Sequence, residues 1–181
     1  VYYEAKERLA KMNTDKFRYG VGFASGIYGC GLDGKDSSFA NIRLNPDGTC
    51  TVYNSWEDHG QGADIGALTM AHEVLREAGF TPEMIKLVQN DTALTPASGP
   101  AGGSRSNVVT GNATRVAAEM LLNAMRKDDG TFRTYEEMTA ENIPTYYEGT
   151  WAAAACTDCD LETAQGAPFS NYMYELFIPE V

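Results

Sequence analysis

Apolar positions recur at helical spacing in two long segments of the chain. In residues 65–78 and 108–125 an apolar side chain returns every three or four positions, which predicts a helix with one buried face in each segment. Gly79 follows the first segment directly, in the position where glycine commonly ends a helix. Shorter helices are expected at residues 1–11 and 135–140.

Runs rich in branched and aromatic residues indicate the strands. Residues 39–44 and 49–56 flank a turn sequence with Pro and Asp-Gly at residues 45–48, and this arrangement predicts a hairpin. The order strands, helix, strand, helix, strands predicts an α+β fold with a mixed or antiparallel sheet and two main helices. Further strands are expected at residues 19–28, 85–88, 147–155 and 171–181.

Composition and charge narrow the class of protein. The chain of 181 residues is 43% hydrophobic and 22% charged, which is typical of a globular protein with a sizeable core. We interpret residues 1–18 as a helix and lead-in, and residues 19–181 as one α+β unit. The formal net charge of -11 argues against nucleic acid or an anionic membrane as partner, because both attract basic patches.

Neither an apolar run of about 18 residues nor a charged leader before an apolar stretch occurs. We therefore expect no membrane span and a cytoplasmic location, with the periplasm as the alternative. The four cysteines are expected to be thiols, because a core of this size needs no disulfides. Cys156 and Cys159 form a single CxxC without a second pair, which argues against a zinc site.

Two glycine-rich loops, residues 58–64 and 98–105, each lead into one of the long helical segments. A helix start presents unpaired backbone N–H groups and the positive end of its dipole, and glycine allows a ligand to approach that backbone closely. The pairing of the loops therefore predicts a site for a phosphate-bearing cofactor. The alternative is that both loops are only turns.

Individual side chains in these loops suit such a ligand. His59 either bonds a phosphate or base edge or is a half-buried histidine satisfied by backbone, and Gln61 offers both a donor and an acceptor. Gly102 and Gly103 permit close approach of the backbone. Arg105 supplies a fixed charge and a planar donor fork to the ligand, or else pairs with a surface carboxylate.

Five strings occur at residues 28–32 (YGCGL), 56–66 (WEDHGQGADIG), 98–105 (SGPAGGSR), 110–113 (TGNA) and 168–181. Together, and in this order along the chain, they resemble the molybdenum-binding part of bacterial aldehyde oxidoreductases in the xanthine oxidase family. The resemblance implies an α+β fold that is part of a molybdopterin-binding domain, and a molybdopterin cytosine dinucleotide held between the glycine loops. It also implies aldehyde hydroxylation at molybdenum with oxygen from water, and electron transfer through two [2Fe-2S] clusters in other domains.

The resemblance also assigns roles by position. Tyr28 and Leu32 match positions that line the substrate channel, and Gly103 matches one beside the pocket of the metal. No residue here is expected to ligate the metal directly. The cofactor-binding residues that the resemblance and the loops together indicate are His59, Gly60, Gln61, Gly62, Ala63, Ala101, Gly102, Gly103, Ser104 and Arg105.

No residue of the chain matches the essential glutamate of the family, and the expected catalytic set within the chain is therefore empty. We expect a fragment that is inactive alone and whose partners are the rest of the molybdenum-binding region, the iron-sulfur domains and a small aldehyde. Self-association through the apolar strand near residues 172–178 is also expected. The alternative function is a nucleotide- or phosphate-binding module without redox chemistry.

Overall fold

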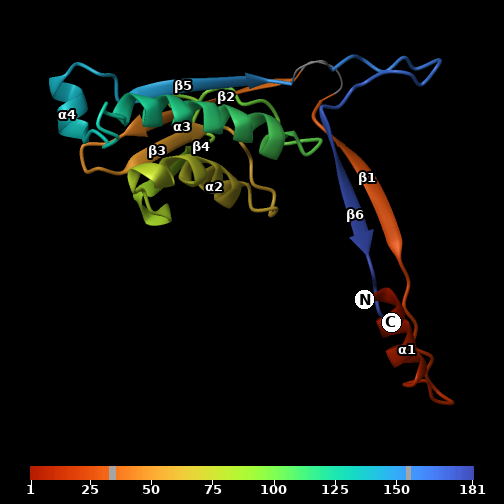
Figure 1. Ribbon diagram of the computed structural model, residues 1–181. Helices are drawn as coiled ribbons and strands as arrows, with labels where there is room; N and C mark the ends of the chain where they lie inside the picture. Colours follow the sequence, from red (N-terminus) through yellow and green to blue (C-terminus); the bar gives the residue numbers. More distant parts are fainter. Residues whose placement is uncertain (33–35, 154–155) are drawn as a thin grey trace. The chain divides into compact units, whose positions relative to one another are not determined.

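Two long helices cover one face of a four-stranded sheet in the computed structural model, which describes residues 1–32, 36–153 and 156–181 (Figure 1). The sheet has the strand order β4-β3-β2-β5, in which β2 is antiparallel to both neighbours and β4 is parallel to β3. The sheet is therefore mixed, as expected. Its strands are β2 (Ser37–Leu44), β3 (Cys50–Asn54), β4 (Ile85–Gln89) and β5 (Tyr146–Ala152).

The core lies between this sheet and the helices α2 (Ala63–Leu75) and α3 (Gly111–Met125). Alternate residues of β2 and β3 point inward, so that Ile42 and Val52 pack with Leu75 and Leu121 in one buried cluster. Each fully buried aliphatic side chain of this size contributes about 1.5–3 kcal/mol. This burial fixes the two helices on the sheet and thereby the loops that precede them.

The ends of the helices follow local sequence signals. A short 3-10 turn, Arg76–Ala78, continues α2 to Gly79, whose φ of 85° ends the helix in the left-handed region. A π-helical turn, Ser106–Thr110, precedes α3. Helix α4 (Tyr135–Ala140) begins with a capping box, and the 3-10 turn Pro82–Met84 leads into β4.

The chain divides into two compact units, residues 30–170 and the remainder. The smaller unit contains α1 (Tyr2–Ala10) and a two-stranded ribbon of β1 (Ala24–Cys30) with β6 (Asn171–Phe177), although Cys30 itself belongs to the larger unit. This division differs from the expected boundary after residue 18. The physical reason is that β6, from the end of the chain, pairs with β1.

The α+β fold with two main helices is confirmed, and the strand ends differ from expectation. Strand β1 begins at Ala24 instead of residue 19, and β6 ends at Phe177 instead of residue 181. Beyond them the two segments form an isolated antiparallel bridge at Val21 and Glu180, with backbone hydrogen bonds between Gly20 and Val181 and from Gly22 to Pro179. Pro179 has no N–H with which to continue a regular ladder. The last two residues of the strand expected at 147–155 lie outside the described residues.

Among the described residues, every helix is too short or too polar to cross a membrane. The four cysteines all lie in the described part of the chain and form no disulfide. Cys50 is buried in the core, and this burial raises the pKa of its thiol to about 12. The thiol of Cys50 therefore stays protonated and has a packing role.

Candidate functional site

The two glycine loops lie at the same end of the larger unit. Helices α2 and α3 run in the same direction, and both begin at the end of the sheet where the two loops are found (Figure 1). Met70 in α2 lies against Gly111 at the start of α3. Ala63 lies seven residues before Met70, and Ser104 lies seven residues before Gly111. Because helices rise by a similar distance per residue, the start of α2 and the second loop lie at a similar height along the two helix axes.

The start of α2 is capped by an acidic side chain of its own loop. The Asp58 carboxylate accepts hydrogen bonds from the backbone N–H groups of Gly60 at 2.7 Å, Gly62 at 3.3 Å and Asp64 at 3.3 Å. These bonds, led by the one from Gly60, lower the pKa of Asp58 below its ordinary value of 3.8. The expectation that this helix start offers unpaired N–H groups to a phosphate therefore needs correction, because Asp58 occupies part of that position.

Replacing Asp58 by alanine is expected to lower the melting temperature of the chain by removing three backbone hydrogen bonds. Because the folded-state pKa is depressed, the effect should be complete above pH 3.8 and should vanish as the pH falls through the lowered pKa. Calorimetry across this range measures it. Asp64→Ala removes a charge at the same helix start without removing these bonds, and an equal loss in that control would contradict the assignment.

The other members of the first loop differ in what they expose. His59 and Gln61 are exposed, and the loop is closed by the Gln61 side chain, which accepts from the His59 N–H and donates to the Glu57 carbonyl at 3.0 Å. Ala63 is buried against Trp56, so only its backbone can face a ligand. The loop therefore presents backbone and the His59 ring to solvent.

The second loop is anchored by a buried serine. Ser98 exchanges hydrogen bonds with Ser55, its hydroxyl donates to the Phe39 carbonyl at 2.8 Å, and its own carbonyl accepts from the Ser38 hydroxyl at 2.9 Å. The Ser38 hydroxyl also lies 2.8 Å from that of Thr110, next to α3. These bonds tie the start of the loop to β2 and to the π-helical turn.

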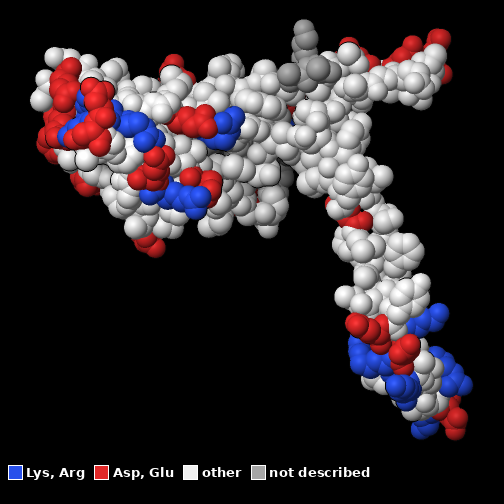
Figure 2. Space-filling view, in the orientation of Figure 1, with Lys and Arg blue, Asp and Glu red and all other residues white. Residues whose placement is uncertain are grey.

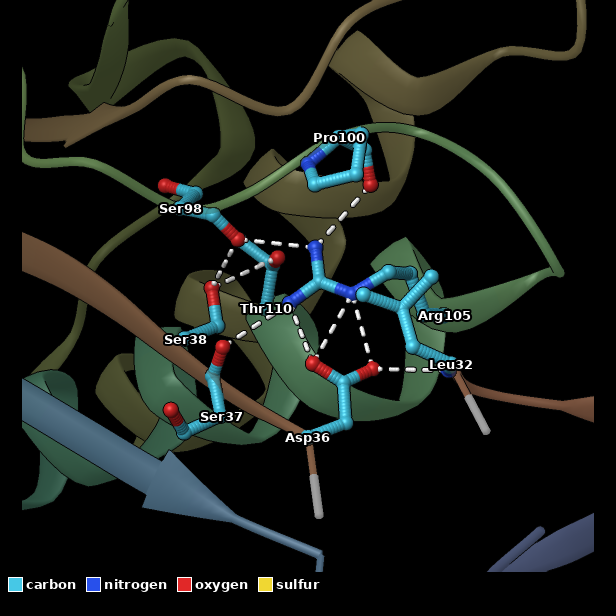
Figure 3. Close-up of polar contacts among 8 residues, drawn as sticks. All are labelled: Leu32, Asp36, Ser37, Ser38, Ser98, Pro100, Arg105 and Thr110. Atoms are coloured by element: carbon cyan, nitrogen blue, oxygen red, sulfur yellow. Dashed lines mark hydrogen bonds and ion pairs between the residues drawn. The ribbon is translucent and has the colours of Figure 1, made fainter. Parts of the chain in front are cut away.

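Arg105 is buried and uses its donors inside the protein (Figure 3). Nε and Nη2 donate to the Asp36 carboxylate at 2.8 Å each, and Nη2 also donates to the Ser37 carbonyl at 2.9 Å. Nη1 donates to the carbonyls of Ser98 at 2.8 Å and Pro100 at 3.0 Å. All five N–H groups are thereby occupied. The expectation that Arg105 offers its charge to a ligand is corrected: its partner is a buried carboxylate, and its function is to hold the loop.

Asp36 is a site residue that sequence reasoning missed. Burial raises the pKa of its carboxyl, but the hydrogen bonds and charge of Arg105, with the N–H groups of Leu32 and Ser37, outweigh burial and lower the pKa. Asp36 and Arg105 are 69 positions apart, and no local motif marks the pair. The pair is therefore visible only once the fold is known.

The end of the second loop meets the segment after β1. The Gly31 N–H donates to the Gly103 carbonyl at 2.8 Å. Gly103 has a φ of 56°, and a Cβ there would lie 2.6 Å from the Gly31 carbonyl oxygen, so a side chain at this position requires the backbone to move. Ser104 follows with a φ of 51°, which is unusual for a residue with a side chain.

The two expected channel residues fall in different units, Leu32 in the larger and Tyr28 in the smaller. Leu32 is 42% exposed, and its N–H donates to the Asp36 carboxylate at 3.1 Å. Tyr28 is 49% exposed on β1. Leu32 is thus brought to the second glycine loop through Asp36 and Gly31. The channel roles of Leu32 and Tyr28 both remain predictions.

Two buried polar atoms near the first loop also escaped sequence reasoning. The Nδ2 atom of Asn54, at the end of β3, and the Oε2 atom of Glu57 are buried without a hydrogen-bond partner among the described residues. Asn54 is 0% exposed, and its Oδ1 atom accepts from the Trp56 N–H at 3.0 Å. Buried polar groups are rarely left unpaired, so these two atoms are exceptions beside the first loop.

Comparison with known proteins identifies the family. The chain belongs to the molybdopterin cofactor-binding domain family, whose model matches residues 1–181. It is 52% identical over 180 residues to an aldehyde oxidoreductase of Megalodesulfovibrio gigas, covering 99% of this chain and 20% of that protein. The resemblance to the molybdenum-binding region of aldehyde oxidoreductases, in the xanthine oxidase family, is thereby confirmed. The chain spans about one fifth of the length of this curated relative.

Solved structures agree with this assignment. The aldehyde oxidoreductases of Desulfovibrio desulfuricans and Desulfovibrio gigas match with TM-scores of 0.87 and 0.91 at 57% and 51% identity, each covering 99% of this chain and 20% of theirs. CO dehydrogenase from Oligotropha carboxidovorans matches with a TM-score of 0.57 at 18% identity, covering 98% of this chain and 26% of its own. The last similarity shows a shared fold alone.

Proposed function

We propose that this chain is part of the cofactor site of a molybdenum hydroxylase that oxidises aldehydes to carboxylic acids with water as the oxygen source. The term parent protein denotes the full-length protein of which this chain is proposed to be a part. The observation that carries the proposal is the position of both glycine loops at one end of parallel helices, in a chain of the molybdopterin cofactor-binding family. Membership of the family supports a molybdenum-pterin cofactor in the parent protein, and its cytosine dinucleotide form is part of the proposal.

The residues of the loops fit a large polar ligand. At Gly60, Gly62 and Gly102 a Cβ atom would meet nothing within 4 Å, so ligand atoms can approach the backbone there. A pterin ring and a pyrimidine ring both carry complementary donors and acceptors, and the open glycine backbone suits phosphates.

The chain's own residues would bind and orient the group. Because the net charge of -11 repels anions at long range, phosphates are proposed to be held by short-range backbone N–H groups of the second loop, since those of Gly60 and Gly62 in the first loop already donate to Asp58. Arg105 contributes by fixing the second loop and makes no direct contact. When bound, the group supplies the two-electron oxidation of the aldehyde carbon. The residues proposed to hold it are His59, Gly60, Gln61, Gly62 and Ala63 in the first loop, and Ala101, Gly102, Gly103 and Ser104 in the second.

Tyr28 and Leu32 are proposed to line the channel through which the aldehyde reaches the cofactor. The Leu32 side chain is apolar, the Tyr28 side chain is partly apolar, and both are substantially exposed, which suits selection of small aldehydes by size and apolarity. The base that activates the oxygen donor, and the [2Fe-2S] clusters that carry electrons away, are proposed to lie elsewhere in the parent protein. A cytoplasmic location is proposed as well.

The β1–β6 ribbon is proposed to be covered by other parts of the parent protein. Along β6, Tyr174 and Leu176 share one face and Phe177 lies on the opposite face, and all three are more than half exposed. The strands of the ribbon contain one charged residue, Glu175, whereas the surface around α4 carries many charges (Figure 2). A two-stranded ribbon with apolar faces is marginally stable in water by itself.

The isolated 181-residue chain is therefore expected to self-associate at micromolar concentrations. Leu176→Lys should shift it toward monomer, because a charge on the ribbon opposes apolar contact. Sedimentation velocity measures the change. Leu161→Lys is the matched control, since Leu161 is 95% exposed outside the ribbon and its replacement should leave association unchanged. Equal effects of the two variants would contradict the role of the ribbon.

Metal and cofactor analysis of the parent protein tests the proposed function. The expected result is molybdenum together with iron, and release of a pterin cytosine dinucleotide on denaturation. A nucleotide or phosphate compound released without molybdenum would instead support a non-redox binding module. The isolated chain is expected to be inactive toward aldehydes, because no residue in it matches the glutamate of the family. Aldehyde oxidation by the isolated chain after cofactor loading would contradict that part of the proposal.

A further inference from the structure

The Asp36 carboxylate joins two segments that the proposed function places in different parts of the site. Its Oδ2 atom accepts from the Leu32 N–H at 3.1 Å and from Arg105 Nε at 2.8 Å. Its Oδ1 atom accepts from Arg105 Nη2 at 2.8 Å. One carboxylate thus connects the backbone of the channel residue Leu32 to the side chain that holds the second glycine loop (Figure 3).

A second connection lies beside the first. The Gly31 N–H donates to the Gly103 carbonyl at 2.8 Å, one residue from Leu32 and two residues from Arg105. The guanidinium also fixes the loop from within, because Nη1 donates to the Ser98 and Pro100 carbonyls. The segment at Gly31 and Leu32 therefore cannot move relative to the loop without breaking hydrogen bonds.

We propose that the Asp36–Arg105 ion pair is a positioning device that sets the place of the Leu32 side chain relative to the cofactor loop, and thereby the size selectivity for aldehydes. The inference rests on the proposed function, in which Leu32 lines the channel and the loop holds the cofactor. Asp36 and Arg105 touch neither substrate nor reacting atoms. They act through Leu32 and Gly103.

Burial of the pair distinguishes this device from a surface contact. The side chains of Arg105 and Asp36 are 1% and 3% exposed, so the bonds act in a region of low dielectric and fix geometry strongly. A purely stabilising role would predict lower thermal stability when the pair is weakened, with unchanged selectivity. A positioning role predicts a local change at Leu32 and a change in the discrimination between aldehydes.

The test uses the parent protein with Asp36→Asn, which keeps the shape of the side chain but replaces one acceptor oxygen by a donor. Hydrogen exchange at Gly31 and Leu32 is expected to accelerate about tenfold. The ratio of KM for a bulky aromatic aldehyde to KM for acetaldehyde should change about threefold or more, while kcat for acetaldehyde, expressed per bound molybdenum, changes about twofold or less. Arg105→Lys keeps the charge but cannot make all five hydrogen bonds, and it should give the same pattern.

Met138→Ala is the control for general destabilisation. Met138 is a buried core residue of α4 that belongs to neither loop, and its truncation should lower thermal stability without altering the exchange at Leu32 or the KM ratio. If Asp36→Asn and Arg105→Lys behave like this control, the positioning role is wrong. Parent protein that lacks molybdenum would contradict the proposed function, whereas the exchange measurement would still decide whether Asp36 links the two segments.

Discussion

Arg105→Met is expected to reduce the free energy of unfolding of the chain by about 3–5 kcal/mol. The substitution keeps much of the apolar volume but removes the partner of the Asp36 carboxylate, which would remain buried and unpaired. It also removes one hydrogen-bond donor from each of the carbonyls of Ser98, Pro100 and Ser37. Urea unfolding followed by circular dichroism measures the loss.

The pH dependence of this loss provides an internal check. With Arg105 present the pKa of Asp36 is lowered, so its contribution to stability exists above the ordinary value of 3.8 and is lost as the pH falls. Without Arg105, burial raises the pKa of Asp36, and the variant is less destabilised in acid, where Asp36 is protonated. The difference between the two proteins should therefore grow as the pH rises above about 4.

Arg115→Met is the matched control for that experiment. Arg115 lies on α3 and pairs with Glu119, but both side chains are more than 40% exposed. An exposed pair of this kind contributes about 0.5 kcal/mol or less. A loss at Arg105 as small as the loss at Arg115 would show that the buried pair does not hold the second loop.

Gly103→Ala in the parent protein is expected to lower the molybdenum content roughly tenfold or more, equivalent to about 1.4 kcal/mol of binding free energy. The new Cβ would lie 2.6 Å from the Gly31 carbonyl oxygen, so the loop must shift and the Gly31–Gly103 hydrogen bond must lengthen. The left-handed backbone, with a φ of 56°, adds strain for alanine of about 1–2 kcal/mol. Elemental analysis of purified protein gives the molybdenum content.

Gly130→Ala is the control that separates the strain of a left-handed backbone from the steric clash of a new Cβ atom. Gly130 also has a left-handed backbone, with a φ of 84°, but a Cβ there would meet nothing within 4 Å. It follows Asp129 in a turn of the larger unit, outside both glycine loops. We expect this variant to retain normal molybdenum content. Equal molybdenum in the two variants would show that the close approach at Gly103 does not shape the cofactor site.

Local sequence signals predicted most of the larger unit. The helical spacing of residues 65–78 and the terminating Gly79 predicted α2, and the turn between β2 and β3 predicted their hairpin, because both depend on neighbouring residues. The pairing of β1 with β6 depends on contacts between the two ends of the chain. Hydrophobic periodicity contains no information on such distant pairing, which is why the expected boundary after residue 18 differs from the observed division.

The sequence predicted the two glycine loops but not the contacts that hold them, and their role in binding a cofactor stays a prediction. Glycines before helical segments located both loops, whereas the partner of Arg105 lies 69 residues away and had no local signal. The Asp58 cap had a signal, because an aspartate shortly before a helix commonly accepts its first N–H groups. An acidic side chain just before a helix competes with an anionic ligand for the first backbone N–H groups of that helix. Both acceptors therefore have to be considered before these N–H groups are assigned to a ligand.

Hydrogen exchange of the parent protein with and without its cofactor tests the central claim most directly. Protein from cells that make molybdopterin is compared with protein from cells that cannot. The account predicts that the cofactor slows exchange in residues 59–63 and 101–105 together, because both loops bind one group. Unchanged exchange in both loops, with protection confined to other segments of the parent protein, would contradict it.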